Sequence, residues 1–450
     1  MEFEELYKSP LGASLSDFGK EIFMPQGIFY WAGRAKNLEF NGTAGTAKVL
    51  RSELNLEGEG MVSCYLGGIE EYVAPDKTDN IVNYAPINGI PKFRELWKQW
   101  IIAKSPNSID VSNKLSTPAV TNGITMGIFA VARMFLNANE KIIVPNKRWG
   151  NYDLILTKQL GVGLEIFEFF KEKAFNVDAL DQAIQNVADA GQEKIVLIVN
   201  FPNNPTGYAP TEKEILAIKE MLIAKAKALE KPIVVICDDA YEGYVYDDGR
   251  VPESIFYHLV DVNKWIVPIK LDGISKEMLL YGGRIGAITF GFSAEWGNAE
   301  ALQKIEKQID NKFQGLIRST ISNCNHLMQE ILVEILEKGP EHVYKMRQAT
   351  YDLLSERYYE CLTAINELNN PNITMDPAGG GFFLFLNIKD VDATELADLL
   401  VTKYSVGLIP IVKPEGGVNG LRVAYCSVPK PKIKELFSRI DQACRELASK

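Results

Sequence analysis

The chain has 450 residues, 46% of them hydrophobic, and a formal net charge of −10. A chain of this length and composition can bury one large core or two moderate ones. The acidic balance, with no basic tail or arginine-rich stripe, argues against nucleic acid or an anionic membrane as the main partner. An anionic substrate is still compatible with such a surface, provided that arginines converge inside a cleft.

Several further classes are disfavoured by the sequence. The acidic start, Met1–Glu5, lacks the basic and apolar stretches of a signal peptide, and no run approaches the roughly 20 apolar residues that span a bilayer. The three histidines share no metal-ligand spacing, and the six cysteines form neither a CxxC motif nor a disulfide framework. We therefore expect a reduced, cytoplasmic location, no metal site, and acid–base chemistry supplied by another residue type such as lysine. The cysteines are Cys64, Cys237, Cys324, Cys361, Cys426 and Cys444.

The middle of the chain alternates short branched-apolar runs with longer helical periods. A helical pattern extends from Thr121 to about Leu136, and four runs typical of buried strands follow. A helix is indicated between the second and third runs, where Thr211 provides a cap-like residue before early acids and apolar residues three and four apart. This rhythm predicts a mostly parallel sheet covered by helices on both faces. The four runs start at Lys141, Lys194, Pro232 and Trp265.

From about residue 325 the pattern changes. A long helix is predicted from Glu341 to Leu368, followed by strand-like stretches at 379–388 and 420–425 and an amphipathic helix from Lys432 to Ala448. These elements predict a smaller α+β lobe. The first 60 or so residues carry no strong sheet signal, and we expect them to pack against that lobe.

Chemically useful side chains follow the predicted strands, where ligands collect in open α/β sheets. Asn204 stands in Asn-Asn-Pro-Thr-Gly after the second strand, and Asp238 and Tyr241 follow the third. Lys276 follows the fourth strand, with Arg284 eight residues later between glycines. A lysine amine can form an imine with an aldehyde, and an arginine fork can pair with a phosphate. Locally, the alternatives are a turn at Asn204, a helix cap at Asp238 and a solvated loop at Lys276 and Arg284, and the solvated loop is the default for the last pair.

Two upstream segments are compatible with the same ligand. Gly123, Ile124 and Thr125 stand at a helix start, where free amides favour an anion such as phosphate. Trp149 follows the strand at Lys141 and could stack on a flat ring, although a core position is the ordinary alternative.

In this order, the residues resemble the pyridoxal-phosphate-dependent aminotransferases of class I/II, which have fold type I. The resemblance extends from about Tyr84 to Arg422 and rests on Asn-Pro-Thr-Gly, Asp-x-Ala-Tyr, Ser-Lys, Gly-x-Arg-x-Gly and a late arginine. The aspartate/aromatic branch is the most similar, because Tyr84–Gly89 resembles its Tyr-x-Pro-x-x-Gly motif and Trp149-Gly-Asn its ring-stacking segment.

The resemblance implies a fold class and a domain division. The fold is α/β, with a mostly parallel seven-stranded sheet between helices in a large domain and a smaller α+β domain. We expect residues 63–325 to form the large cofactor-binding domain, and residues 1–62 and 326–450 to form the smaller one.

The resemblance also implies roles for individual residues. Lys276 would bind pyridoxal 5'-phosphate covalently and then move the α-proton, while Asp238 would keep the pyridine nitrogen protonated. Arg422 would bind the substrate α-carboxylate as a bidentate fork. Asn204 and Tyr241 would contact the ring oxygen and Trp149 would stack on the ring, with Asn204 and Trp149 also near the substrate. The phosphate would be held by Gly123, Ile124, Thr125, Ser275, Arg284 and, from a neighbouring subunit, Tyr84.

The sequence departs from the family at two positions. Gly273 stands where the family often has a serine that contacts the phosphate. Tyr152 stands where the aspartate branch commonly has a histidine. We expect neither to touch the central chemistry, although both would alter cofactor affinity or substrate preference.

The substrate side chain is the least determined feature. Arg318, in an Arg-x-x-x-Ser-Asn pattern, resembles the arginine that the dicarboxylate branch supplies from a partner subunit, but a surface or interface arginine is an equal alternative. Gly45 is placed in an N-terminal flap over the substrate. We therefore expect a homodimeric aminotransferase acting on an L-amino acid, with aspartate favoured, and a 2-oxo acid such as 2-oxoglutarate. Aromatic specificity, a β-lyase or decarboxylase, and a non-catalytic regulator are the alternatives.

Overall fold

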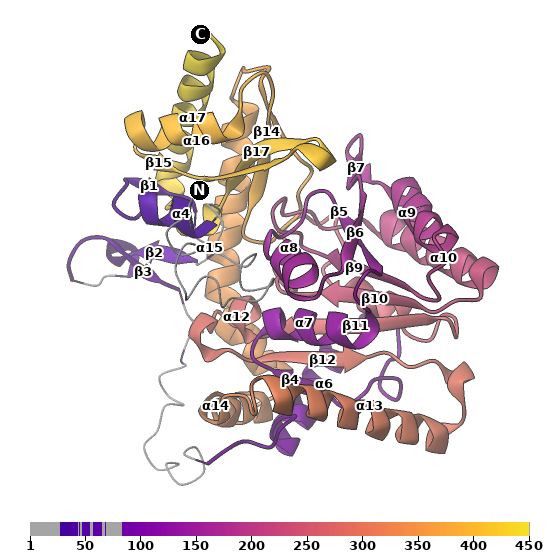
Figure 1. Cartoon of the computed structure of the whole chain (residues 1–450). Helices are drawn as coiled ribbons and strands as arrows, with labels where there is room; N and C mark the ends of the chain where they lie inside the picture. Colours follow the sequence, from indigo (N-terminus) through magenta and orange to yellow (C-terminus); the bar gives the residue numbers. More distant parts are fainter. Residues whose placement is uncertain are drawn as a thin grey trace, which may run out of the picture.

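A sheet of seven strands forms the centre of the larger part of the molecule (Figure 1). The computed structural model describes residues 28–43, 45, 47–54, 57–64, 68 and 83–449. All adjacent strands are parallel except β12, which is antiparallel to both neighbours. The mostly parallel sheet expected from the sequence is thus confirmed. In spatial order the strands are β4 (Ala119–Thr121), β12 (Gly286–Phe290), β11 (Ile266–Gly273), β10 (Ile233–Asp238), β9 (Ile195–Asn200), β5 (Lys141–Pro145) and β6 (Gly163–Phe167).

Both faces of this sheet are buried, as the continuous apolar runs predicted. Successive strand side chains point to opposite faces, and Leu197 and Val235 belong to one hydrophobic cluster whereas Ile198 and Val234 belong to another. The first cluster is covered by α6 (Pro91–Lys104), α9 (Val177–Asp189), α10 (Glu212–Leu229), α11 (Ile255–Leu259) and α14 (His326–Glu337). The second is covered by α7 (Ile124–Phe135), α8 (Asn151–Asp153), the π-helix η4 (Leu154–Gln159) and α13 (Ala299–Thr320).

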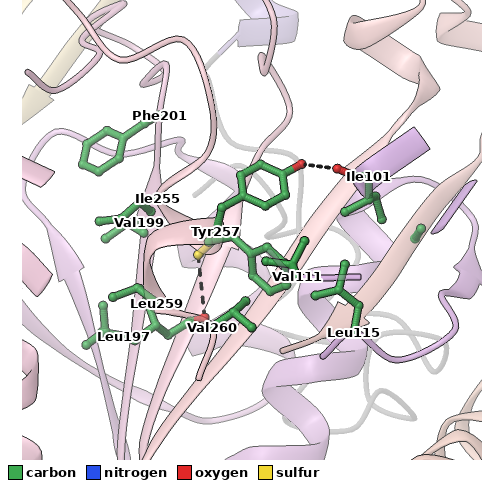
Figure 2. Close-up of a cluster of buried hydrophobic side chains, with 14 of the residues drawn as sticks. Ile101, Val111, Leu115, Leu197, Val199, Phe201, Ile255, Tyr257, Leu259 and Val260 are labelled. Atoms are coloured by element: carbon green, nitrogen blue, oxygen red, sulfur yellow. Dashed lines mark hydrogen bonds between the residues drawn. The ribbon is translucent and has the colours of Figure 1, made fainter. Parts of the chain in front are cut away.

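Figure 2 shows how the first cluster joins sheet and helices. Leu197 and Val199 of β9 lie near the side chains of α11, and the Tyr257 hydroxyl donates a 3.0 Å hydrogen bond to the Ile101 carbonyl of α6. The start of α10 has the expected cap, since Thr211 and Glu214 bond to each other's backbone amides as a capping box.

A four-stranded antiparallel sheet forms the smaller part of the molecule, in the order β13 (Ile373–Met375), β14 (Leu384–Ile388), β17 (Val418–Val423), β16 (Ile409–Lys413). Its helices are α15 (Pro340–Asn366), α16 (Ala393–Lys403) and α17 (Ile433–Ala448). The predicted helices at 341–368 and 432–448 correspond closely to α15 and α17. Helix α14 falls in the range that the sequence assigned to the smaller domain, but it packs against α6 in the first cluster of the larger part.

Described N-terminal residues contact the smaller part of the molecule. Strand β1 (Phe40–Asn41) pairs in parallel with β15 (Val406–Gly407), and Trp31 of α4 (Ile28–Arg34) shares a hydrophobic cluster with α15 and α17. The remaining elements are β2 (Lys48–Leu50), η1 (Arg51–Leu54), β3 (Met61–Ser63), β7 (Phe170–Lys171), β8 (Ala174–Phe175), α12 (Ile274–Glu277), η5 (Tyr281–Gly283), η6 (Ala294–Trp296), η7 (Pro414–Gly416), η8 (Tyr425–Ser427) and η9 (Lys430–Lys432). None of the helices in the described ranges is long and apolar enough to cross a membrane.

Candidate active site

A cavity of about 790 Å³ lies where the carboxyl ends of β9, β10 and β11 face β16 and β17 of the smaller sheet. Parallel strands end at one edge of their sheet, which explains why motifs far apart in the sequence meet there. Most residues proposed from the sequence line this cavity: Gly45, Ile124, Thr125, Trp149, Asn204, Asp238, Tyr241, Ser275, Lys276, Arg284 and Arg422.

Lys276 stands in the short helix α12, directly after β11, and projects into the cavity. Its ammonium nitrogen lies 2.8 Å from the Gly45 carbonyl oxygen and 4.7 Å from the centre of the Tyr281 ring. Loss of solvent, together with the positive charges of Arg422 and Arg284, lowers the pKa of Lys276 to about 8. An amine with this pKa is partly neutral near pH 8, as a nucleophile or general base must be.

Asp238 ends β10 and is 3% exposed. It accepts a 2.5 Å hydrogen bond from the Tyr152 hydroxyl and another from the Ala240 amide. Burial raises the pKa of Asp238 to about 6, while the Tyr152 hydrogen bond lowers it. Among the described residues Asp238 has no ion-pair partner, so a cation placed beside it would satisfy its charge. The Tyr152 hydroxyl thus directly contacts the carboxylate that the resemblance assigns to the pyridine nitrogen.

Arg422 of β17 forms the opposite wall and is 3% exposed. Its guanidinium donates to the Asn204 side-chain oxygen at 3.2 Å and to the Thr43 carbonyl at 2.8 Å, and it lies 4.2 Å from the centre of the Phe383 ring. The Nε atom of Arg422 is buried without a hydrogen-bond partner. A buried guanidinium that lines a cavity and keeps an unpaired donor is suited to binding a carboxylate.

Arg284 and the start of α7 form an anion cradle. Gly123 precedes α7 and has a φ of 78°, which favours glycine. A Cβ at this position would lie 2.4 Å from a terminal nitrogen of Arg284, so a side chain would displace the guanidinium. The Arg284 guanidinium also lies 3.3 Å from the Ser275 hydroxyl. The first amides of a helix have no acceptor within it, so the amides at Ile124 and Thr125 can add to the cradle.

Gly273 is explained by a close approach of two strands. It pairs with Gly286 across β11 and β12, and a Cβ at 273 would lie 2.6 Å from the Ile285 carbonyl oxygen and 2.8 Å from the Gly286 Cα. A serine would therefore force the backbone apart.

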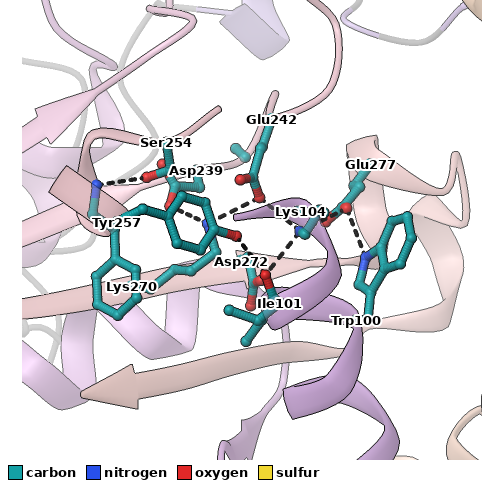
Figure 3. Close-up of polar contacts among 12 residues, drawn as sticks. Trp100, Ile101, Lys104, Asp239, Glu242, Ser254, Tyr257, Lys270, Asp272 and Glu277 are labelled. Carbon is teal, nitrogen blue, oxygen red and sulfur yellow. Dashed lines mark hydrogen bonds and ion pairs between the residues drawn. The ribbon is translucent and has the colours of Figure 1, made fainter. Parts of the chain in front are cut away.

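Figure 3 shows a buried network of charges that includes Asp239 and Glu277. The Lys270 ammonium lies 2.5 Å from Asp239 and 2.9 Å from Glu242, and the Lys104 ammonium lies 2.6 Å from Glu242 and 2.8 Å from Glu277. Oxygen atoms of Glu242, Asp272 and Glu277 lie within 4.8 Å of one another, and the two ammonium groups offset their repulsion. Because Asp239 follows Asp238 and Glu277 follows Lys276, the network ties together the two segments that carry them.

Three of the proposed residues do not line this cavity: Gly123, which lies against the Arg284 guanidinium, and Tyr84 and Arg318. The Tyr84 side chain is 86% exposed, and Arg318 is an exposed residue of α13 that hydrogen-bonds to the Ser322 hydroxyl. Both belong to one region of the surface, because Asn323 of the Arg318 motif donates to the carbonyl of Ala85 at 2.6 Å. Neither Tyr84 nor Arg318 lines the cavity.

The sequence did not indicate several residues of the cavity wall. Phe383, Tyr281, Arg148 and the strand 409–413 all line the cavity. The glycine run before Phe383 was the only local signal, since three successive glycines mark a close backbone approach. The others are ordinary core or surface residues in sequence.

The fold and the cavity together define a pyridoxal-phosphate enzyme of fold type I. The family model described as aminotransferase class I and II matches residues 72–440, and the chain belongs to this family. A probable aspartate/prephenate aminotransferase of Aquifex aeolicus is 25% identical over 374 residues, which cover 81% of this chain and 84% of that protein. The aromatic-amino-acid aminotransferase 2 of Thermococcus litoralis is 24% identical, covering 86% of this chain and 92% of that protein.

Solved structures show the same fold. An aminotransferase of Anaerococcus prevotii has a TM-score of 0.78 at 24% identity, covering 95% of this chain and 98% of that one. The kynurenine aminotransferase of Pyrococcus horikoshii, solved with PMP, has a TM-score of 0.76 at 17% identity, covering 98% of each chain. The protein is an aminotransferase that uses pyridoxal 5'-phosphate, and its substrates are amino acids and 2-oxo acids.

Proposed function

We propose that this aminotransferase takes an amino group from L-aspartate and passes it to 2-oxoglutarate. The observation that carries the proposal is the placement of Arg422 and Lys276 in one cavity, where the buried guanidinium has an unpaired donor and the amine has a pKa of about 8. An amino acid held by its α-carboxylate at Arg422 would present its α-carbon toward Lys276.

We propose the following roles for the side chains toward the cofactor. The charge of Asp238 fits a protonated pyridine nitrogen, and the hydroxyl of Tyr152 holds that carboxylate in place. Arg284, Ser275 and the start of α7 fit the phosphate. When bound, the cofactor supplies an electron sink for the substrate's α-carbon. Lys276 then takes the α-proton and returns it.

The remaining cavity residues complete this assignment. Asn204 bonds to Arg422 and so orients the carboxylate-binding group. Tyr241 is buried at the cavity beside Phe382 and Phe383, and its hydroxyl would contact the ring oxygen. Trp149 would stack on the ring. Gly45 lies so close to Phe383 that a Cβ would be 2.7 Å from its ring, so a side chain there would narrow the substrate space.

We also propose a homodimer. Tyr84 and Arg318 lie together on the surface, away from their own cavity, which is where residues donated to a second copy would stand. The six cysteines are not joined in disulfides, which supports a cytoplasmic location. For the domains, we propose a large unit of about residues 63–339, because α14 packs in its core, with the other residues in the small unit.

The test is a donor and acceptor screen on the holoenzyme. L-Aspartate with 2-oxoglutarate should yield oxaloacetate and glutamate, with the parallel double-reciprocal lines of a ping-pong mechanism. Absence of turnover with every dicarboxylate donor would overturn the aspartate assignment, and turnover with aromatic donors alone would favour the aromatic alternative. Release of pyruvate, ammonia or carbon dioxide would instead indicate a lyase or decarboxylase.

A further inference from the structure

Positive side chains outnumber negative ones in the cavity wall. Among the described residues, five cationic side chains line it and Asp238 is the only carboxylate. Three of the cations, Lys276, Arg284 and Arg422, have roles in the proposed reaction. The other two, Arg148 and Lys413, have none.

Arg148 and Lys413 share one counter-ion. The Asp153 carboxylate lies 2.8 Å from Arg148 Nε and 2.6 Å from Lys413 Nζ. The exposed fractions of the Arg148 and Lys413 side chains are 2% and 14%. Water therefore solvates the two charges only slightly. The Glu415 carboxylate is 54% exposed and lies 3.9 Å from Arg148, and such a loose surface pair contributes little. Arg148 also donates to the Pro145 carbonyl at 3.2 Å. The two cations therefore share only one close carboxylate, and an incoming carboxylate would add a second.

The register of the smaller sheet places this pair in line with the carboxylate-binding arginine. Ile409 of β16 is directly opposite Arg422 of β17, and paired residues of antiparallel strands point to the same face. Alternation along β16 puts Ile411 and Lys413 on that face too. Four residues of strand span about 14 Å, so the long side chains of Arg422 and Lys413 must lean toward each other for one small dicarboxylate to reach both.

We propose that Lys413, supported by Arg148, is the subsite for the side-chain carboxylate of the amino donor, within the same subunit. The substrate class is then amino acids with an anionic side chain. The Lys413 ammonium pairs with the incoming carboxylate while Asp153 continues to neutralise Arg148. This inference rests on the proposed function and adds the group that recognises the side chain, a role that the family resemblance assigns to Arg318.

The test compares two probes bound to the holoenzyme, the dicarboxylate maleate and the monocarboxylate 3-phenylpropionate. Binding is followed by tryptophan fluorescence, because Trp149 lines the cavity. Replacing Lys413→Met should raise the Kd of maleate about tenfold or more, the size expected for one hydrogen-bonded charge. The Kd of 3-phenylpropionate should change less than about twofold, because it has no second carboxylate to lose a partner.

Three variants serve as controls. Lys413→Arg should restore maleate binding, since it keeps the charge, and Lys413→Gln provides a second test if the methionine variant fails to fold. Lys389→Met removes an exposed lysine far from the cavity wall and should change neither Kd. Equal effects of Lys413→Met on both probes, or no effect on either, would overturn the proposal.

The proposed reaction and the subsite can fail separately. A selective loss of maleate binding in Arg318→Leu, with none in Lys413→Met, would assign the side-chain carboxylate to Arg318 and overturn the subsite. If the wild-type enzyme transfers no amino group from aspartate while maleate binding still depends on Lys413, the donor assignment fails and the subsite stands.

Discussion

The Tyr152 hydroxyl donates a 2.5 Å hydrogen bond to the carboxylate of Asp238, 86 residues away in sequence. Both groups are buried, and the ring of Tyr152 packs edge-on against Trp149 at 5.6 Å. Tyr152, which departs from the family pattern, thus contacts both Asp238 and Trp149. We propose that Asp238 binds the nitrogen of the cofactor ring and that Trp149 stacks on the face of the ring.

Removing this hydroxyl should weaken cofactor binding. The hydrogen bond favours the ionised form of Asp238, so Tyr152→Phe should raise the pKa of that carboxyl further. Hydrogen bonds to charged groups contribute roughly 1.5–3 kcal/mol, which corresponds to a loss of about tenfold or more in affinity for pyridoxal 5'-phosphate. Absorbance titration of the apoenzyme measures it. Tyr359→Phe, which removes an exposed hydroxyl bonded to a carbonyl, should leave the affinity unchanged.

Asp238 should destabilise the apoenzyme at neutral pH. Burial raises the pKa of Asp238 from 3.8 to about 6 in the folded state. The folded state therefore binds the proton more tightly than the unfolded state, and the contribution of Asp238 to stability is most favourable below pH 4 and is lost as the pH rises through 6. Asp238→Asn should therefore raise the free energy of unfolding at pH 8 by about 2 kcal/mol, with a smaller gain at pH 5. Urea unfolding of the apoprotein at both pH values tests this. An unchanged or lower stability at pH 8 would contradict it, and the holoenzyme variant should lose activity.

Lys276 should react with the cofactor in a pH-dependent manner. Because its pKa is lowered to about 8, the rate of cofactor attachment to the apoenzyme should rise with pH with a midpoint near 8. Borohydride reduction followed by peptide mass spectrometry should locate the cofactor on Lys276. Lys276→Ala should lose this label and about 10²–10⁴-fold in rate, whereas Lys304→Ala, at an exposed lysine, should behave as wild type. A label at another lysine would refute the assignment.

The buried network should be sensitive to loss of one cation. Lys270→Met would leave Asp239 and Glu242 without their shared partner, and breaking a buried pair costs about 3–5 kcal/mol. Lys304→Met breaks an exposed pair with Glu300 and should cost less than about 0.5 kcal/mol. Comparison of their urea midpoints checks the difference. Similar midpoints would mean that the network does not stabilise the strand ends.

Restoring the serine common in the family should be harmful here. Gly273→Ser would bring a Cβ within 2.6 Å of the Ile285 carbonyl oxygen, and overpacking of this kind costs about 1–3 kcal/mol. We expect a lower melting temperature and weaker cofactor binding. Gly282→Ser is the matched control, because nothing lies within 4 Å of a Cβ there. A gain in cofactor affinity with Gly273→Ser would show that the added hydroxyl outweighs the strain.

The sequence by itself determined the order of the elements and the groups that carry the chemistry. Periodicity located β5, β9, β10 and β11, and the motifs containing Asn204, Asp238, Lys276 and Arg284 follow strand ends or a glycine-framed turn. Such signals are local, since strand alternation, caps and glycine turns depend on neighbouring residues. The rule that ligands collect at strand ends then placed them together.

Tertiary structure alone decided which side chains support that chemistry. Tyr152 reaches Asp238 across 86 residues, Lys104 reaches Glu242 across 138, and Arg422 reaches Asn204 across 218. The sequence singled out Tyr152, Asn204 and Arg422 but not these contacts, and it gave no signal for Lys104. The clash that excludes serine at 273 likewise depends on the backbone of another strand. Contacts of this kind are set by how strands and helices pack, and local sequence patterns carry no record of that packing.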